Sequence, residues 1–183
     1  MISEFESERL ILKTSYEVTP EQLLRYYSHN RLFFEQHEPM QGDSYYTLEY
    51  QTKALRYEIG NMDKMYSAYY YYFLKDEPEE MIGSMSFSRI RKEPYASTIF
   101  GYNIHEDYQG HGYCTEGCKA AIEHLLSITH IHRIEARVLT DNEKSIRVLE
   151  RLGFFHEGFE KASILIAGQF RDHLRYAYIN ENY

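Results

Sequence analysis

The stretch of the chain best suited to chemistry runs from residue 109 to residue 115, and we call it the glycine loop. Its sequence is Gln109-Gly110-His111-Gly112-Tyr113-Cys114-Thr115. The two glycines let the backbone turn sharply and approach a ligand closely. A predicted helix follows at once, and its first turn presents unpaired N–H groups at the positive end of the helix dipole. Together these features predict a site for a phosphate or pyrophosphate, although two glycines alone also fit a tight turn without a ligand.

Other phosphate and metal motifs do not fit. No Gly-Lys-Ser or Gly-Lys-Thr follows the glycine loop, so it is not a nucleotide P-loop. Thr115 stands where the dinucleotide-binding fingerprint has its third glycine. No metal is expected. His130 and His132 lie two residues apart but lack a third ligand. The two cysteines, Cys114 and Cys118, lack the paired spacing of a zinc site.

A second candidate segment lies downstream, where Asn142-Glu143-Lys144-Ser145 begins a predicted helix that ends at Leu152-Gly153. Asn and Ser are common at helix starts because they cap the free N–H groups. Taken alone, this segment therefore has a sufficient structural explanation. Its interest comes from its order and spacing relative to the glycine loop.

The elements that position these segments are predicted from hydrophobic periodicity and turn residues. Strands are expected at residues 9–12, 65–74, 81–90, 96–104, 133–139, 154–160 and 170–179. One helix is expected to start at Pro20 with Thr19 as its N-cap, and a second is expected at residues 47–59 with a stop at Gly60-Asn61. A third should follow Gly112, with an apolar stripe formed by Cys114, Cys118, Ala121, Ile122 and Leu125. A fourth is expected at residues 143–152. The acidic turn at residues 75–80 makes a hairpin of the strands beside it. Antiparallel strands followed by strand–helix–strand–helix predict a mixed sheet in one α+β domain, residues 1–183.

The composition excludes several classes of protein. The 183 residues carry 20 basic and 28 acidic side chains, a net charge of -8, which argues against a nucleic-acid binder. The start of the chain lacks the basic and apolar segments of a signal peptide, and no apolar run approaches the ~20 residues that span a membrane. Two cysteines four residues apart suit a reducing compartment, so a cytoplasmic protein is expected. The unusual feature is 19 tyrosines with no tryptophan.

In this order and spacing, the segments resemble the GNAT superfamily of acyl-CoA-dependent N-acyltransferases. The similarity is greatest to the branch that acetylates the N-termini of ribosomal proteins. It covers nearly the whole chain and is specific in combination, although each motif is weak. The motifs are Ser7-Glu8-Arg9-Leu10-Ile11-Leu12, Ile82-Gly83, Phe100-Gly101-Tyr102-Asn103-Ile104, the glycine loop with Glu116, His132-Arg133-Ile134-Glu135-Ala136, Asn142-x-x-Ser145 through Leu152-Gly153-Phe154, and Glu157-Gly158, Gly168 and Asp172.

The resemblance implies a sheet that is splayed open between the strand ending at Ile104 and the strand starting at Arg133, and flanked by helices. The pantetheine arm of acetyl-CoA would lie in that opening. Backbone groups of Tyr102, Asn103 and Ile104 would pair with it, and residues Gln109, Gly110, His111, Gly112, Tyr113, Cys114 and Thr115 would bind the pyrophosphate. Asn142 would touch the pantetheine arm, and Ser145 would lie near the sulfur.

The chain departs from the family pattern at the catalytic positions. Leu149 stands where a tyrosine often serves as general acid, and Ile99 where a glutamate often serves as base. We expect Ser145 to act on the departing sulfur; the alternative is a first-turn helix residue bonded to backbone. Glu135 is the candidate base; the alternative is a solvated outer position on its strand. A water relay that ends on a Tyr or His stays open as the base.

The expected function is transfer of an acetyl group from acetyl-CoA to a primary amine, by direct attack in a ternary complex. The acceptor would be a protein N-terminus or a small cationic amine. The alternative is a CoA-binding sensor or partner module without turnover, and a homodimer is one open option for the assembly. Tyrosines 26, 27 and 69 belong to a tyrosine-rich half of the chain, which predicts an acidic, tyrosine-lined acceptor cleft with cation–π contacts.

Overall fold

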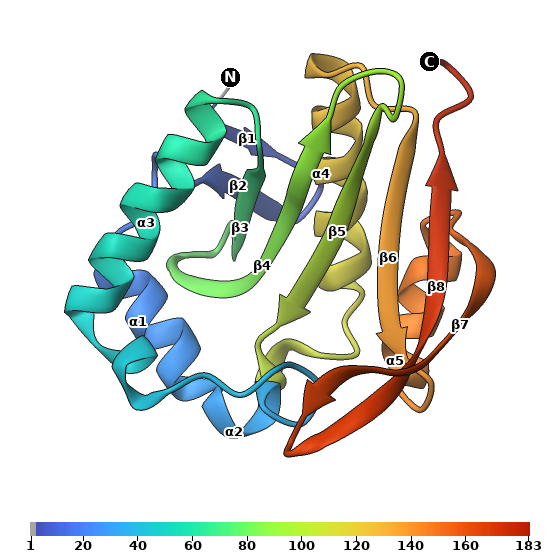
Figure 1. Cartoon of the computed structure of the whole chain (residues 1–183). Coiled ribbons are helices and arrows are strands. Elements are labelled where there is room, and N and C mark those ends of the chain that lie inside the picture. Colours follow the sequence, from blue (N-terminus) through green and yellow to red (C-terminus); the bar gives the residue numbers. More distant parts are fainter. Residues whose placement is uncertain (1–2) are drawn as a thin grey trace.

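The protein is described from residue 3 to residue 183 in a computed structural model. Its centre is one mixed β-sheet, which confirms the expected α+β class with helices on the sheet (Figure 1). The strand order is β1-β2-β3-β4-β5-β6-β8-β7, and β5 and β6 form the parallel pair. The strands are β1 (Glu4–Glu6), β2 (Leu10–Thr14), β3 (Ala68–Leu74), β4 (Glu77–Arg91), β5 (Ser97–Ile104), β6 (Arg133–Leu139), β7 (Phe155–Ile166) and β8 (Gln169–Ile179).

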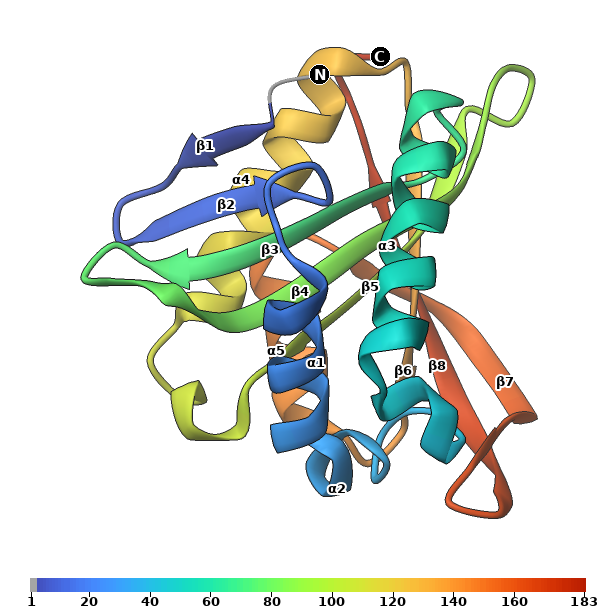
Figure 2. The same cartoon turned by 90° about the vertical axis from the view of Figure 1, so that its left-hand side faces the viewer.

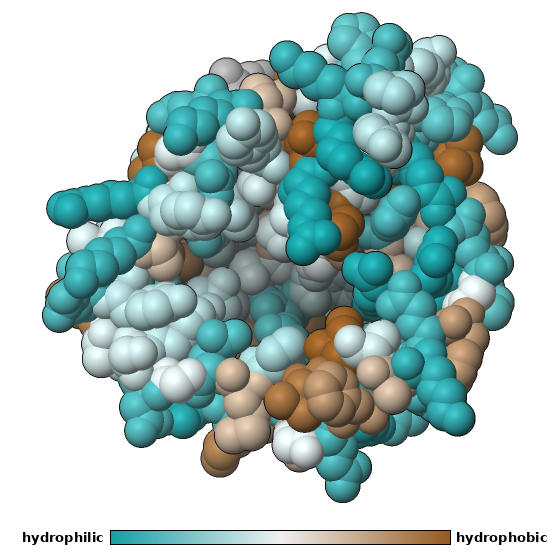
Figure 3. Space-filling view, in the orientation of Figure 1, coloured by the Kyte–Doolittle hydropathy of each residue, from teal (hydrophilic) through white to brown (hydrophobic). Residues whose placement is uncertain are grey.

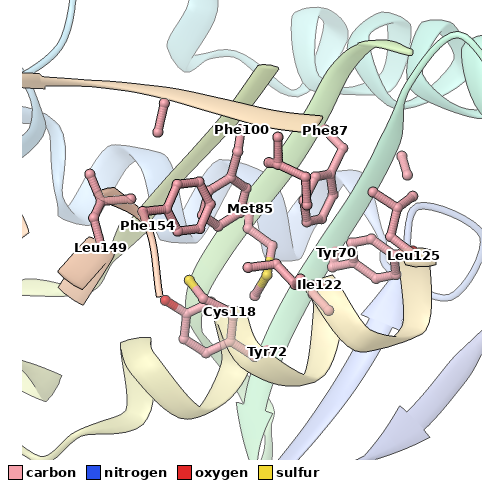
Figure 4. Close-up of a cluster of buried hydrophobic side chains, with 14 of the residues drawn as sticks. Tyr70, Tyr72, Met85, Phe87, Phe100, Cys118, Ile122, Leu125, Leu149 and Phe154 are labelled. Atoms are coloured by element: carbon pink, nitrogen blue, oxygen red, sulfur yellow. The ribbon is translucent and has the colours of Figure 1, made fainter. Parts of the chain in front are cut away.

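Helices cover both faces of the sheet, with α1 and α3 on one side and α4 on the other (Figure 2). Both faces of the sheet are covered because the side chains of strand β3 alternate between the two faces. Tyr70 and Tyr72 are buried against α4 (Figure 4), whereas Tyr71 and Phe73 are buried against α1 and α3. The helices are α1 (Pro20–His29), α2 (Arg31–Phe34), α3 (Leu48–Asp63), α4 (Tyr113–Ile128) and α5 (Glu143–Arg151), with 3-10 turns η1 (Asp43–Tyr46) and η2 (Glu106–Tyr108).

The sheet opens between β5 and β6, as the resemblance implies. Residues 97–100 pair with residues 133–136, and the pairing stops there. Beyond that point β5 continues to pair with β4, and β6 continues to pair with β8. Among residues 3–183, no strand pairs with the second backbone edge of residues 101–104.

Most predicted elements are confirmed, and the differences have local causes. Thr19 caps α1 in a reciprocal capping box with Gln22, as expected from its position before Pro20. Helix α3 does not stop at Gly60 but continues to Asp63, because Met62 on the next turn is buried and outweighs the low helix propensity of glycine.

The β3–β4 turn is shorter than expected and occupies only Lys75 and Asp76. Strand β4 begins at Glu77, because the register shifts between Phe73 and Leu74 and accommodates residues 78–80 as a bulge. Pro78 lies in that bulge, where its missing N–H costs no ladder hydrogen bond. Strand β7 is also longer than predicted and reaches Ile166. No helix in the described part of the chain is both long and apolar enough to cross a membrane.

Candidate active site

The glycine loop joins β5 to α4 in a conformation that requires its glycines. Gly110 and Gly112 have φ angles of 81° and 83°, in the left-handed region that other residues rarely adopt. Gly112 is the N-cap of α4, and no side chain caps this helix among residues 3–183. The N–H groups of the first turn therefore remain available to a ligand, as the sequence predicts.

Arg9 fixes the glycine loop from the opposite side, a role that sequence reasoning missed. Its guanidinium donates to the His111 backbone oxygen at 3.0 Å and to Glu116 Oε2 at 2.8 Å. Glu116 Oε1 accepts from the Ser7 hydroxyl and the Arg9 N–H, each at 2.7 Å. The guanidinium also stacks 4.5 Å from the centre of the Tyr113 ring. These contacts explain why the motif at residues 7–12 accompanies a glycine loop far away in sequence.

A cavity of about 820 Å³ occupies the opening between β5 and α5; we call it the larger cavity. Its lining includes ten of the residues predicted to hold acetyl-CoA: Tyr102, Asn103, Ile104, Gln109, Gly110, Gly112, Cys114, Thr115, Asn142 and Ser145. His111 and Tyr113 are not part of the lining, because their rings stack on each other outside it, 5.5 Å apart. Lys144 donates to Gln109 Oε1 at 2.8 Å and so joins the glycine loop to the start of α5.

Ser145 lies in the first turn of α5 and contacts the other side of the opening. Its backbone N–H donates to Asn142 Oδ1 at 3.1 Å, so Asn142 caps the helix as well as lining the cavity. The Tyr102 hydroxyl lies 2.7 Å from Ser145 Oγ and 3.0 Å from its backbone oxygen. Burial raises the pKa of Tyr102 well above its usual value, so this hydroxyl keeps its proton. The Tyr102 side chain therefore links β5 to α5 where the strands have separated.

Glu38 is the second residue that sequence reasoning missed, because it lies in an irregular segment after α2 with no periodic signal. It is half-buried, and its Oε1 accepts from Asn103 Nδ2 at 3.0 Å. Burial raises the pKa of Glu38, and the bond from Asn103 opposes that shift. Asn103 is held in turn by the Tyr26 and Ser84 hydroxyls, each 2.7 Å from its Oδ1.

A second space of about 370 Å³, the smaller cavity, adjoins the larger one. The two share six lining residues: His37, Glu38, Tyr102, Asn103, Asn142 and Ser145. The smaller cavity also carries Glu58 and the rings of Tyr27, Tyr45, Tyr69 and Tyr71. The surface is hollowed near the centre of this face of the molecule (Figure 3). The smaller cavity is thus lined by tyrosines and two carboxylates, but Tyr26 is not part of its lining. Tyr26 is buried, and its hydroxyl donates to Asn103 Oδ1.

Glu135, the predicted base, is not brought to either cavity. It lies opposite Ile99 in the part of the sheet where β5 and β6 still pair, before the opening begins. Its carboxylate accepts from Arg133 Nε at 2.9 Å, and Arg133 also pairs with Glu157. Glu135 therefore occupies an ion-paired position on β6, outside both cavities.

His105 also lies outside both linings, although it follows β5 directly. It is buried, stacks 4.6 Å from His29, and its Nδ1 accepts from the Asp107 backbone N–H at 3.2 Å. Burial lowers the pKa of His105. His105 therefore shapes the end of β5 and does not face the site.

The geometry of a split sheet, a glycine loop and two joined cavities agrees with the comparisons with known proteins. The acetyltransferase (GNAT) domain family matches residues 9–155. The chain belongs to the GNAT acetyltransferase family. This membership makes the chain an N-acetyltransferase, and it does not favour a binding module without turnover.

Individual relatives of this GNAT acetyltransferase cover nearly its whole length. The [ribosomal protein uS5]-alanine N-acetyltransferase of Escherichia coli K12 is 33% identical over 169 residues, covering 92% of this chain and 86% of the relative. The ribosomal-protein-S5-alanine acetyltransferase of Vibrio fischeri superposes with a TM-score of 0.91 at 27% identity, covering 98% of this chain and 97% of its own. RimL, a ribosomal L7/L12 acetyltransferase solved with coenzyme A, gives a TM-score of 0.83 at 25% identity, covering 94% and 95%.

Proposed function

We propose that residues 1–183 form one enzyme domain that transfers the acetyl group of acetyl-CoA to the α-amine of a protein or peptide, in the cytoplasm. One observation carries the proposal: the two cavities share lining residues, and Tyr102, Asn103, Ser145 and Glu38 are among them. A donor in the larger cavity and an acceptor in the smaller cavity would therefore meet between Ser145 and Glu38. The relatives named for ribosomal-protein alanine support an α-amine as the acceptor.

The larger cavity has the features that acetyl-CoA needs. The unpaired edge of residues 101–104 offers backbone groups to the amides of the pantetheine arm, as an added strand would use them. The uncapped start of α4 and the two left-handed glycines suit a pyrophosphate. Lys144 and Arg151 line the larger cavity and can contact phosphate groups, whereas Arg147 is paired with Glu143 of the same lining. We therefore place acetyl-CoA in the larger cavity.

The reaction joins the acceptor nitrogen to the acetyl carbon and breaks the carbon–sulfur bond. The acceptor must first lose a proton, and Glu38 is the carboxylate at the junction that can take it. An α-amine, with a pKa of about 7.7–8.0, is already about one fifth neutral near pH 7.2, so a carboxylate of modest basicity is sufficient. Glu38 replaces the base that we expected at Glu135.

The sulfur leaves as a thiolate that the Ser145 hydroxyl can hydrogen-bond, and the second proton that the nitrogen loses as the amide forms passes to the sulfur. Either hydroxyl can be the donor across the 2.7 Å contact between Tyr102 and Ser145 Oγ. Where Tyr102 donates to Ser145 Oγ and not to the Ser145 backbone oxygen, the serine hydrogen is free for the sulfur. Because the pKa of Tyr102 is raised, the phenol stays neutral throughout. Positioning of the two reactants supplies much of the remaining rate, by up to about 7–11 kcal/mol in well-oriented systems.

The proposal is tested by measuring acetyl-CoA binding and acetyl transfer in the wild type and in Gly112→Ala. Alanine at φ 83° costs about 1–2 kcal/mol, and its Cβ would lie 3.4 Å from the Arg9 guanidinium. We expect weaker acetyl-CoA binding and slower acetylation of α-amine peptides. Gly158→Ala is the matched control, because Gly158 has open space around its Cβ position and does not line either cavity. Unchanged acetyl-CoA affinity in Gly112→Ala would contradict this assignment of the larger cavity.

A further inference from the structure

The smaller cavity holds a second carboxylate, Glu58, that the proposed reaction does not use. Glu58 is half-buried on α3, and both of its hydrogen bonds fall on one oxygen. Its Oε2 accepts from the Ser15 hydroxyl at 2.7 Å and from the Tyr71 hydroxyl at 2.6 Å. Over residues 3–183, Glu58 Oε1 has no hydrogen-bond donor, and no Lys, Arg or His forms an ion pair with this carboxylate. Half of this carboxylate is therefore available to a ligand.

Glu58 and Glu38 occupy different parts of the joined space. Glu38 lines both cavities and lies at the junction with the thioester, whereas Glu58 lines only the smaller cavity. An acceptor that enters the smaller cavity would therefore place one group at Glu38 and another at Glu58. The volume of about 370 Å³ is enough for a single side chain or a short aliphatic amine.

The other charged groups of the smaller cavity already have partners. Arg137 Nε donates to Glu160 at 2.8 Å, so its charge is neutralised from the outer side. His37 Nδ1 contacts the Phe33 backbone oxygen at 3.4 Å, and His173 Nδ1 contacts the Ser163 hydroxyl at 2.9 Å. Neither Arg137 nor the two histidines form an ion pair with Glu58 among residues 3–183, so no basic side chain compensates this carboxylate inside the cavity.

The surroundings of Glu58 favour the binding of a cation. Burial raises its pKa, and the two hydroxyl donors oppose that shift and so favour the ionised form. A partly buried carboxylate without a counter-ion is unfavourable, and a cationic ligand removes that cost. The rings of Tyr27, Tyr45 and Tyr71 line the same cavity and would add cation–π attraction.

We propose that the preferred acceptor carries a second cationic group, a short aliphatic chain away from the amine that is acetylated, and that Glu58 binds this group. A basic first residue of a peptide and a free diamine share this chemistry. The inference rests on the proposed function, since Glu38 and the thioester define the other end of the acceptor. It adds a selectivity that the reaction itself does not require.

The test compares ligands that differ only in the second charge. Isothermal titration calorimetry on the CoA-saturated protein measures the affinity of two hexapeptides that begin with lysine or with uncharged norleucine, and of 1,5-diaminopentane against pentylamine. In the wild type we expect the dicationic member of at least one pair to bind about tenfold more tightly. The pair that shows the preference identifies the source of the acceptor. Equal affinities within both pairs would overturn the inference.

Two variants assign the preference to Glu58. In Glu58→Gln the preference should fall below about threefold, and in Glu58→Asp it should persist in part, because the charge remains. Glu49→Gln is the matched control, because Glu49 lies exposed on the same helix and pairs with Lys53 on the surface. A preference that survives in Glu58→Gln would refute the role of Glu58. Acetyl transfer to the same acceptors is measured separately from affinity. Absence of acetylation with every acceptor would refute the proposed function and not the role of Glu58 in binding.

Discussion

Replacing Glu38 with glutamine should slow the acetylation of an α-amine about a hundredfold near neutral pH. A positioned base contributes about 10²–10⁴-fold. The low end applies here, because freeing an α-amine near pH 7.2 costs only about 1 kcal/mol, whereas a lysine-type amine with a pKa of about 10.4 costs about 4 kcal/mol. Glutamine keeps the shape of the side chain and can still contact Asn103. The loss of rate therefore measures the contribution of the carboxylate group and not that of side-chain packing.

The pH dependence of the acetylation rate distinguishes Glu38→Gln most clearly from the wild type. The active form is the carboxylate, and its pKa is raised by burial, so wild-type kcat/KM for the acceptor should fall as the pH drops through that raised pKa. In Glu38→Gln this acid limb should follow the pKa of the acceptor amine instead. The difference between the two enzymes should therefore shrink above about pH 9, where an α-amine is neutral without help.

The assay is steady-state release of free CoA with a peptide acceptor from about pH 5 to pH 9.5. Glu123→Gln serves as the control, since Glu123 is exposed on α4 and lines neither cavity. The affinity for acetyl-CoA should stay unchanged in Glu38→Gln. A wild-type rate and pH profile in Glu38→Gln would refute the assignment of Glu38 as the proton acceptor.

Four further substitutions test the supporting contacts. Arg9→Met should raise KM for acetyl-CoA about five- to tenfold with little change in kcat, because the Arg9 side chain is 44% exposed and its ion pair is worth about 1 kcal/mol. Ser145→Ala should lower kcat about ten- to a hundredfold, and Tyr102→Phe should lower it less, since the phenol acts through the serine. Gly83→Ala should lower the melting temperature by about 3–10 °C, because a Cβ there would lie 1.8 Å from the Tyr72 ring.

Control variants and opposing outcomes distinguish these specific effects from a general loss of folding. Arg25→Met removes an exposed arginine that pairs with Glu80 and not with the glycine loop, and it should leave KM for acetyl-CoA unchanged. An unaltered KM in Arg9→Met would mean that the glycine loop keeps its shape without the guanidinium. Full kcat in Ser145→Ala would remove the serine from the reaction. A melting temperature that stays constant in Gly83→Ala would show that the Tyr72 ring can move aside.

The sequence was sufficient wherever a local rule decides the structure. Thr19 before Pro20 predicts a helix start, and the stripe from Cys114 to Leu125 predicts the buried face of α4, because both depend on neighbours within a few turns. The left-handed Gly110 and Gly112 follow from the same local reasoning. Position along the chain was enough to identify these features.

The acceptor side was not predictable in this way, because it depends on where distant segments meet. Glu38 and Glu58 come from a loop and a helix that carry no motif, and they share a cavity only after α1 and α3 pack on the sheet. Glu135 lies outside both cavities for a related reason: the sequence does not tell at which residue β5 and β6 separate. That boundary lies after Phe100, which keeps Glu135 in the closed part of the sheet.

The most direct test of the central claim is the site of acetylation in one peptide that offers two amines. The purified protein is incubated with acetyl-CoA near pH 7.2 and a peptide with a free α-amine and an internal lysine, and fragment-ion mass spectrometry locates the acetyl group. We predict acetylation of the α-amine with release of an equal amount of CoA. CoA release no faster than hydrolysis, or acetylation confined to the lysine side chain, would contradict α-amine transfer at the junction of the two cavities.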